Sequence, residues 1–276
     1  MIALIRTLVV FVGVLIATAD RGSACAARDF LEEDLRPIPK DPVLASLLQA
    51  YPSLRVDAQN GLLVTNDEAS VEIGVSSSGV GIAVLKAPSV RDQFRYIYPL
   101  DFDLTKRLRA WEDPGRVRNA RFMEVLYFSD AQTAKASLQS VAAPSGGAVF
   151  HVTTKHGVNC QLASALEQIG PGFTKLFQQI GGSFNWRTIS GTTRLSVHSF
   201  GAAVDLNSTL GGYWKWAGRP AGQAGKFDNK IPEAVVRAFE RYGFIWGGKW
   251  HHFDGMHFEY RPELILYSRH LNAAKG

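Results

Sequence analysis

The chain has 276 residues, of which 46% are hydrophobic and 20% are charged, and its formal net charge is +5. This is an ordinary globular composition with enough apolar side chains for a sizeable core, in one domain with an extension or in two small domains. The positive charge suits an anionic polymer or surface as partner, but the sequence has no dense Lys/Arg run and no basic patch interleaved with aromatic residues, which argues against nucleic acid.

The N-terminal segment predicts export. Arg6 precedes an apolar run over residues 8–19, and small residues follow it. This order is typical of a secretory signal peptide, and the run is shorter than the roughly 20 residues that a membrane span needs. Cleavage after Ala19 or after Ala26 fits the pattern, so we expect residues 1–26 to be removed and the mature protein to be secreted or periplasmic, without a stable membrane span. The alternative is a buried N-terminal helix.

The two cysteines are Cys25 and Cys160. Cleavage after Ala26 would remove Cys25 and leave Cys160 as a lone, buried thiol, whereas a Cys25–Cys160 disulfide requires the earlier cleavage. A lipid anchor on Cys25 is disfavoured because Gly22 stands where the acylation motif has leucine. Two cysteines cannot form a zinc cluster, so any metal site must use His and carboxylate side chains.

Residues 27–149 predict a strand-rich extension of unknown role. The segment 43–51 suits a short helix. Between residues 61 and 100, runs rich in β-branched residues and punctuated by Gly, Ser and Pro predict short strands in LLVTN, VEIGV and VGIAVLK. A turn over residues 111–118 is expected to end this region.

From about residue 146 helices and strands alternate, and we expect a domain over residues 150–270. The predicted elements, in chain order, are a strand in GAVFHVTT, a helix over 160–170, further helical turns in FTKLFQQIGG, a strand over 183–190, an amphipathic helix over 231–244, and a strand, glycine turn and strand over 244–260. They predict the α+β class, with a small antiparallel sheet that carries the functional site and is covered by helices.

The stretch SVHSFGAAVDL, residues 196–206, places His198 and Asp205 seven positions apart. Gly201 interrupts regular structure between them, so we expect a bend after His198 and then a strand. Because side chains alternate along a strand, Asp205 faces away from its apolar neighbours and returns to the side of His198. Taken alone, the stretch fits a simple hydrogen-bonded His–Asp pair equally well.

A second stretch, DGMHFEY at residues 254–260, places His257 and Glu259 on one strand face and Asp254 beside the turn. A His/Asp/His trio from two separated strands suits Zn²⁺, with a fourth position for water. Zinc lowers the pKa of bound water from about 15.7 to about 7. The site then needs a carboxylate outside the ligand set as base. Asp254 is placed for this, and Glu259 is its main rival or a partner of His257.

The two stretches together resemble the signature of the zinc D-alanyl-D-alanine peptidase family, which includes vancomycin-resistance dipeptidases and carboxypeptidases and phage L-alanyl-D-glutamate endolysin peptidases. That signature reads Ser-x-His, two residues, Gly-x-Ala-x-Asp, and later Asp or Glu, two residues, His. The resemblance covers roughly residues 150–265. The positions that match are Ser196, His198, Gly201, Ala203 and Asp205, followed by Asp254 and His257.

The resemblance implies a role for each matched residue. His198, Asp205 and His257 would bind Zn²⁺, and Asp254 would be the general base and acid. Family members also carry an arginine before the histidine motif, where this chain has Arg187 in FNWR. Its implied role is to hold a substrate carboxylate or polarise the scissile carbonyl, which suits a planar bidentate donor. The alternative for Arg187 is a solvated charge at a strand end.

Other polar residues near the motifs are weaker candidates. Ser196 is two residues from His198 and is expected to contact substrate or a metal ligand. Arg194 is a weaker competitor for the role of the upstream arginine. His251 and His252 are adjacent, so at most one faces the site, where it would stabilise an oxyanion or lie on the rim.

We therefore expect a secreted zinc metallopeptidase that hydrolyses peptidoglycan stem peptides with metal-activated water and an Asp base. Whether it acts as a D,D-carboxypeptidase, a dipeptidase or an L,D-endopeptidase is left open. The alternative is a non-catalytic, zinc-containing cell-wall binding module of the hedgehog-like type, and a third hypothesis is a structural metal site. Asp254 discriminates between them, because a binding site needs no base beside the metal.

Overall fold

A computed structural model describes residues 26–37, 41–189 and 192–274 of the chain. The predicted signal sequence and Cys25 therefore lie outside the described residues, apart from Ala26. Within the described ranges, the helices are too short or too polar for any of them to traverse a bilayer. The molecule combines helices with small antiparallel sheets, which confirms the α+β class.

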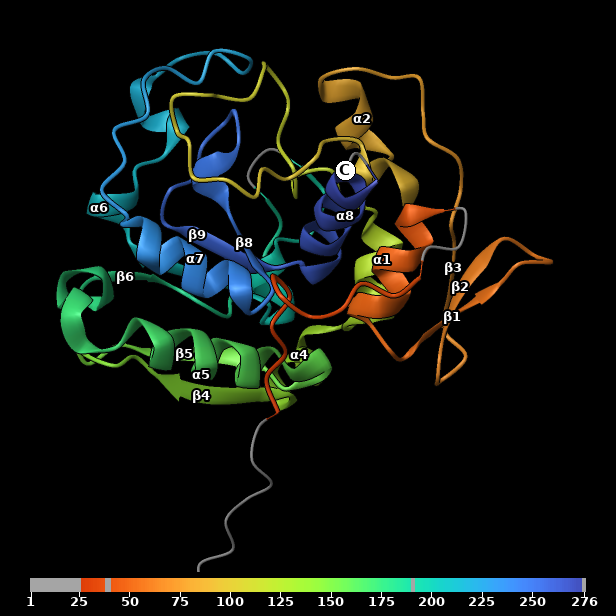
Figure 1. The fold of residues 1–276 in the computed structure, drawn as a ribbon, viewed down its shortest axis with the longest axis horizontal. Coiled ribbons are helices and arrows are strands. Elements are labelled where there is room, and N and C mark those ends of the chain that lie inside the picture. Colours follow the sequence, from red (N-terminus) through yellow and green to blue (C-terminus); the bar gives the residue numbers. More distant parts are fainter. Residues whose placement is uncertain (1–25, 38–40, 190–191, 275–276) are drawn as a thin grey trace, which may run out of the picture.

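The N-terminal part consists of short elements: α1 (Pro42–Ala50), β1 (Leu54–Asp57), β2 (Leu62–Thr65), β3 (Ser70–Glu72), α2 (Ile82–Lys86), α3 (Ala120–Leu126) and α4 (Ala131–Ala136). The first three strands form an antiparallel sheet in the order β1-β2-β3, on the right of Figure 1. Helix α1 starts where the Asp41 carboxylate accepts hydrogen bonds from the first free backbone N–H groups. It confirms the helix predicted over 43–51.

The C-terminal part contains β4 (Leu138–Ala142), β5 (Val149–Thr153), α5 (Val158–Ile169), β6 (Ile180–Gly182), β7 (Ala203–Asn207), α6 (Ser208–Gly211), α7 (Glu233–Arg241), β8 (Phe244–Trp246), β9 (His257–Tyr260) and α8 (Pro262–Ala273). Its main sheet is antiparallel, in the order β6-β7-β9-β8. Helix α7 packs on β8 and lies beside α5, and α8 packs against α1 (Figure 1). The helices predicted over 160–170 and 231–244 are confirmed as α5 and α7.

Two predicted elements are wrong, and a third is only partly right. The run VGIAVLK contains helix α2 instead of a strand, because Gly81, at φ +58°, turns the chain into a helical turn. Residues 183–190 form no strand in their described part, where only Thr188 makes an isolated bridge, to Leu195. The helical turns expected in FTKLFQQIGG are present in the 3-10 helix Pro171–Phe177, but the segment ends in strand β6 instead. A Cβ atom on Gly181 would come within 2.7 Å of the Asp205 Cβ, so the glycine allows β6 to pair closely with β7.

One apolar core joins the two parts of the chain. Buried side chains from before residue 150, such as Leu47 and Phe122, belong to the same cluster as Phe239 and Phe258 from the main sheet and its covering helix. The rings of Phe239 and Phe258 stack with centroids 4.1 Å apart. Each such side chain contributes about 1.5–3 kcal/mol on burial, so the N-terminal segment is part of what stabilises the sheet.

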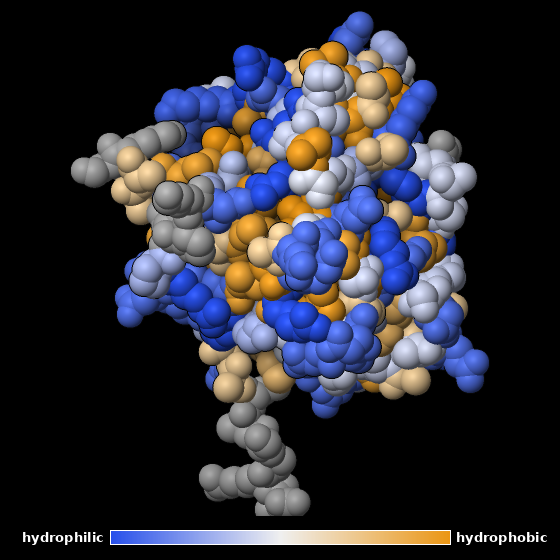
Figure 2. All heavy atoms as spheres, turned by 90° about the vertical axis from the view of Figure 1, so that its right-hand side faces the viewer, coloured by the Kyte–Doolittle hydropathy of each residue, from blue (hydrophilic) through white to orange (hydrophobic). Residues whose placement is uncertain are grey.

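The surface and the second cysteine complete the description. Figure 2 shows the face that carries β1–β3, where hydrophilic residues surround smaller apolar areas. Apolar atoms contribute more than half of the accessible surface of a folded protein, so such areas are ordinary. Cys160, on α5, is disulfide-bonded, so in this structure it is not the lone thiol that cleavage after Ala26 would leave.

Candidate metal centre

The local backbone delivers three side chains to one place. His198 lies in a short 3-10 helix, Val197–Phe200, and Gly201 ends this helix in the left-handed region at φ +65°. A Cβ atom there would lie 2.9 Å from the backbone nitrogen of Thr153, so only glycine fits the bend. Strand β7 follows, and its Asp205 lies opposite His257 of β9 in the antiparallel register. The predicted bend and strand are both present.

The ligand atoms of these three residues converge. His257 Nδ1 lies 2.8 Å from Asp205 Oδ1, and His198 Nε2 lies 3.3 Å from Asp205 Oδ2. The two imidazole nitrogens are 3.2 Å apart. Among the described residues, this is the group of His, Cys, Asp and Glu side chains whose ligand atoms meet closely enough to hold one ion.

Hydrogen bonds on the far side of each ring determine which nitrogen faces the cluster. His198 Nδ1 lies 2.5 Å from the carbonyl of Ser183, and His257 Nε2 lies 3.0 Å from Glu259 Oε2. Each acceptor receives a hydrogen bond from its ring, so His198 Nε2 and His257 Nδ1 face each other and Asp205, where they can offer their lone pairs to a cation. Zn–N distances of 2.0–2.1 Å place tetrahedral ligand atoms about 3.3 Å apart, so the observed separations fit a zinc ion.

Glu259 anchors His257 from within the core. The carboxylate is fully buried, with Oε2 3.1 Å from Arg118 Nη1 and Oε1 3.4 Å from Arg261 Nη1. Burial raises the pKa of Glu259, but Arg118, the His257 hydrogen bond and Arg261 outweigh it and lower the pKa to about 2. Glu259 is therefore an ionised partner of His257, and its oxygens are already engaged, which weighs against it as the base.

Asp254 lies at the edge of the cluster. Its backbone N–H donates to the carbonyl of Gly247, and its side chain is 21% exposed, with Oδ2 4.0 Å from Arg116 Nη2. Burial raises the pKa of Asp254 above its ordinary value, against the opposing effect of His257. A carboxyl with a raised pKa, partly open to solvent and outside the ligand triangle, suits proton transfer.

A cavity of about 140 Å³, the metal cavity, is lined by the residues to which the motifs gave a chemical role: Arg187, Ser196, His198, Asp205, Asp254, His257 and Glu259. Arg187 is exposed, and its backbone N–H donates to the Ser199 hydroxyl, which ties it to the histidine motif. The strand expected to carry Arg187 is absent, but the arginine still lines the cavity. Ser196 is buried beside it.

Arg194 and the paired histidines lie elsewhere. Arg194 Nη1 donates to the Arg116 carbonyl, and its side chain lines neighbouring cavities instead of this one. His252 Nδ1 lies 2.6 Å from the Asp113 carboxylate, and His251 Nδ1 faces the carbonyl of Leu108. Neither histidine lines the metal cavity, so an oxyanion role for them has no support in the geometry.

The motifs did not indicate four further residues of the cavity: Arg116, Arg118, Tyr213 and Lys215. Arg116 lies over the Trp250 ring at 4.6 Å and approaches Asp254, and Arg118 holds Glu259. Both arginines come from the segment expected to be a turn. Their carboxylate partners are more than 130 residues away in the sequence, so no local motif could indicate these contacts. The sequence shows only two arginines close to a glycine.

Comparison with known protein families gives one result. Residues 190–260 match the family model for D-alanyl-D-alanine carboxypeptidase. The matched segment contains His198, Asp205, Asp254 and His257, so it spans the convergent cluster, and it indicates a peptidase. Arg187 precedes the matched segment. Comparisons with curated proteins and with solved structures found no match.

Proposed function

We propose that the protein is a zinc-dependent peptidase that hydrolyses peptidoglycan stem peptides. The observation that carries this proposal is the meeting of two imidazole nitrogens and a carboxylate, with each imidazole oriented by a separate acceptor behind it. Burial lowers the pKa of His257, but its hydrogen bonds to Asp205 and Glu259 outweigh burial and raise the pKa to about 10, so the three ligand atoms meet around one positive charge, either a proton or a metal ion. The carboxypeptidase family match over the same residues supports the peptidase assignment.

His198, Asp205 and His257 would hold the ion, which supplies Lewis acidity and lowers the pKa of water in the site. Asp254 accepts the proton of the attacking water on its carboxylate and returns it to the leaving amine. Glu259 keeps the Nδ1 lone pair of His257 directed at the cluster throughout.

The charge of the cavity suits a peptide with a free carboxylate. Arg187 and Lys215 line the cavity, and no ion pair involves either of them among the described residues. The planar guanidinium of Arg187 can bind a terminal carboxylate through two hydrogen bonds. The predicted signal sequence would export the enzyme to the cell wall, where such peptides occur. Asp254 in the cavity weighs against the alternative, a non-catalytic binding module of the hedgehog-like type.

The decisive test is mass spectrometry of defined muropeptides after incubation with the zinc-loaded protein. Cleavage is expected, with chelator sensitivity and recovery on adding zinc. Asp254→Asn should keep the zinc and lose about 10²–10⁴-fold in turnover, because it removes only the proton acceptor. His198→Ala should lose both zinc binding and turnover, because it removes a ligand. A zinc-loaded protein that cleaves no muropeptide would overturn the proposal, and full turnover by Asp254→Asn would assign the base elsewhere.

A further inference from the structure

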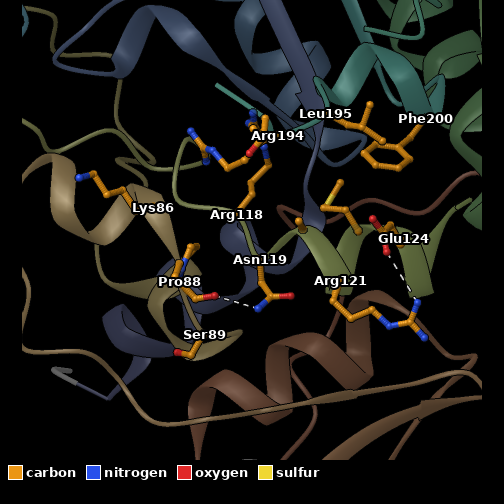
Figure 3. Close-up of a pocket in the computed structure, with 14 residues that line it drawn as sticks. Lys86, Pro88, Ser89, Arg118, Asn119, Arg121, Glu124, Arg194, Leu195 and Phe200 are labelled. Atoms are coloured by element: carbon orange, nitrogen blue, oxygen red, sulfur yellow. Dashed lines mark hydrogen bonds and ion pairs between the residues drawn. The ribbon is translucent and has the colours of Figure 1, made fainter. Parts of the chain in front are cut away.

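Figure 3 shows a second and larger cavity, of about 530 Å³. It adjoins the metal cavity. The segment 193–200 forms the wall between them. Arg194, Leu195 and Phe200 line the larger cavity, whereas Ser196 and His198 line the metal cavity. Arg118 lines both. The larger cavity is therefore a direct neighbour of the candidate catalytic site.

The sizes of the two cavities indicate that they accommodate different parts of a peptide. Ligand pockets usually measure about 300–1,000 Å³. The metal cavity, at about 140 Å³, has room only for the scissile peptide bond and the atoms next to it. The larger cavity falls within the usual range. A peptide cut at the metal would have to extend beyond the smaller cavity, and the larger one lies on the other side of its wall.

The larger cavity carries unneutralised positive charge. Its cations are Lys86, Arg118, Arg121 and Arg194, and its one carboxylate is Glu124. Arg118 is bound to Glu259, and Arg121 lies 3.7 Å from Glu124. Lys86 and Arg194 have no carboxylate partner among the residues that the structure describes.

Arg194 is the best placed of these cations to bind an anion. Figure 3 shows it beside Arg118 at the edge of the cavity, and the two guanidinium groups repel each other. Burial lowers the pKa of Arg194, and nearby Arg116 lowers it further. A half-buried cation among other cations gains much from a ligand carboxylate. Met123, Leu195 and Phe200 supply apolar wall on the same cavity.

We propose that the larger cavity is a substrate subsite that binds an acidic residue of the peptide, away from the bond that is cut. Arg194 binds the carboxylate, Lys86 adds positive charge at the rim, and the apolar wall packs against the peptide's aliphatic groups. The assignment of the ligand as peptide rests on the proposed function. The part of the chain before residue 150 supplies most of the residues that line this subsite, outside the segment that matches the family model.

The test compares two N-acetylated pentapeptides that end in D-Ala-D-Ala and differ by one internal residue, glutamate or glutamine, placed in turn at each internal position. Binding is measured by calorimetry to zinc-loaded protein that carries Asp254→Asn. At one position at least, the glutamate peptide should bind about tenfold more tightly, the typical effect of one charge-assisted hydrogen bond. Arg194→Gln should abolish this preference, and Lys86→Gln should reduce it.

Matched controls separate the subsite from the metal cavity. Lys135→Gln, on the exposed side of α4, should keep the preference for the glutamate peptide. Arg187→Gln should weaken the binding of both peptides by the same factor. Thermal unfolding checks that each variant is folded. Equal affinities for the two peptides at every position, or a preference that survives in both Arg194→Gln and Lys86→Gln, would overturn the subsite. Binding preference without cleavage by the wild-type protein would support the subsite and reject the peptidase function.

Discussion

At the scale of single residues, the candidate metal site depends on the groups behind its three ligand residues. The Ser183 carbonyl and the Glu259 carboxylate determine which nitrogen of each imidazole faces Asp205. Glu259 itself stays ionised because Arg118 and Arg261 reach it in the core. The residues that are hydrogen-bonded to the ligands thus orient the ligand atoms. Replacing such a residue should change the metal affinity although the residue itself does not bind the metal.

Glu259→Gln tests this dependence. The amide can still accept from His257, but it leaves Arg118 and Arg261 without the negative charge between them. Zinc affinity should fall about 10–100-fold, as for other partners of metal-bound histidine. The loss of a buried ion-pair partner should also destabilise the fold by about 3–5 kcal/mol. Competition with a chromophoric chelator and urea unfolding measure the two effects.

The control is Glu167→Gln, which makes the same change on the exposed face of α5. This control should leave both the zinc affinity and the free energy of unfolding unchanged. If Glu259→Gln bound zinc as tightly as the wild type, the orienting role of the carboxylate would have to be abandoned.

At the scale of elements, the bend before β7 controls where His198 lies. Gly201 combines a positive φ with backbone packed 2.9 Å from the position of its missing Cβ. Gly201→Ala should therefore both strain the backbone and push the 3-10 helix away from β5, at about 1–3 kcal/mol or more. The midpoint of thermal unfolding should drop by several degrees, and zinc affinity should fall with it.

Gly172→Ala is the matched control, because nothing lies within 4 Å of the Cβ that it adds and its φ is not positive. Its unfolding midpoint should stay within about a degree of the wild type, as for surface substitutions generally. An equally small effect of Gly201→Ala would show that the bend tolerates a side chain.

His156, between β5 and α5, predicts a pH dependence of stability. Burial lowers its pKa to about 4, despite the hydrogen bond with the Leu126 carbonyl. An unfolded histidine titrates near 6.5, so the unfolded chain takes up the proton first as the pH falls. Stability from the neutral ring is fully present above pH 6.5 and is lost towards pH 4, by up to about 3 kcal/mol.

Urea unfolding at pH 7 and pH 4.5 measures this loss in the wild type and in His156→Asn, which tolerates the positive φ of this position. The variant should lose less stability on acidification, and His151→Gln, at an exposed site, should behave as the wild type. An unchanged pH dependence in His156→Asn would rule out this histidine as the source.

At the scale of the whole molecule, the N-terminal segment and the metal site form one packed body. Arg118 holds Glu259, Tyr51 donates to Glu263 at 2.7 Å, and Glu263 in turn binds Arg261 beside Glu259. The apolar core crosses the same boundary at residue 150. The division into an extension and a domain remains a prediction, but the contacts argue that neither part keeps its structure alone.

A fragment of residues 150–276 tests the point. It lacks Arg118 and the apolar side chains that α1 and α3 pack into the core, so it should show little cooperative unfolding by circular dichroism. It should also bind zinc at least tenfold more weakly than the full chain, since the partner of Glu259 is missing. A cooperative, zinc-binding fragment would establish the domain boundary as predicted from sequence.

The sequence by itself determined the chemistry of the candidate ligands and much of their local placement. The His198 and His257 motifs, the glycine bend and the alternation along β7 and β9 follow from residue type and spacing over a few positions. The amphipathic helix α7 follows from periodicity in the same way. These features are local, so a short stretch contains the information that specifies them.

Only the tertiary structure decided what surrounds the ligands. Arg116 and Arg118 meet Asp254 and Glu259 across more than 130 residues, and the larger cavity forms between segments that no motif connects. The position of β6 was also missed, because it depends on pairing with β7 and not on its own glycine-rich sequence. The packing of the whole core determines such contacts, so no local pattern of residues predicts them.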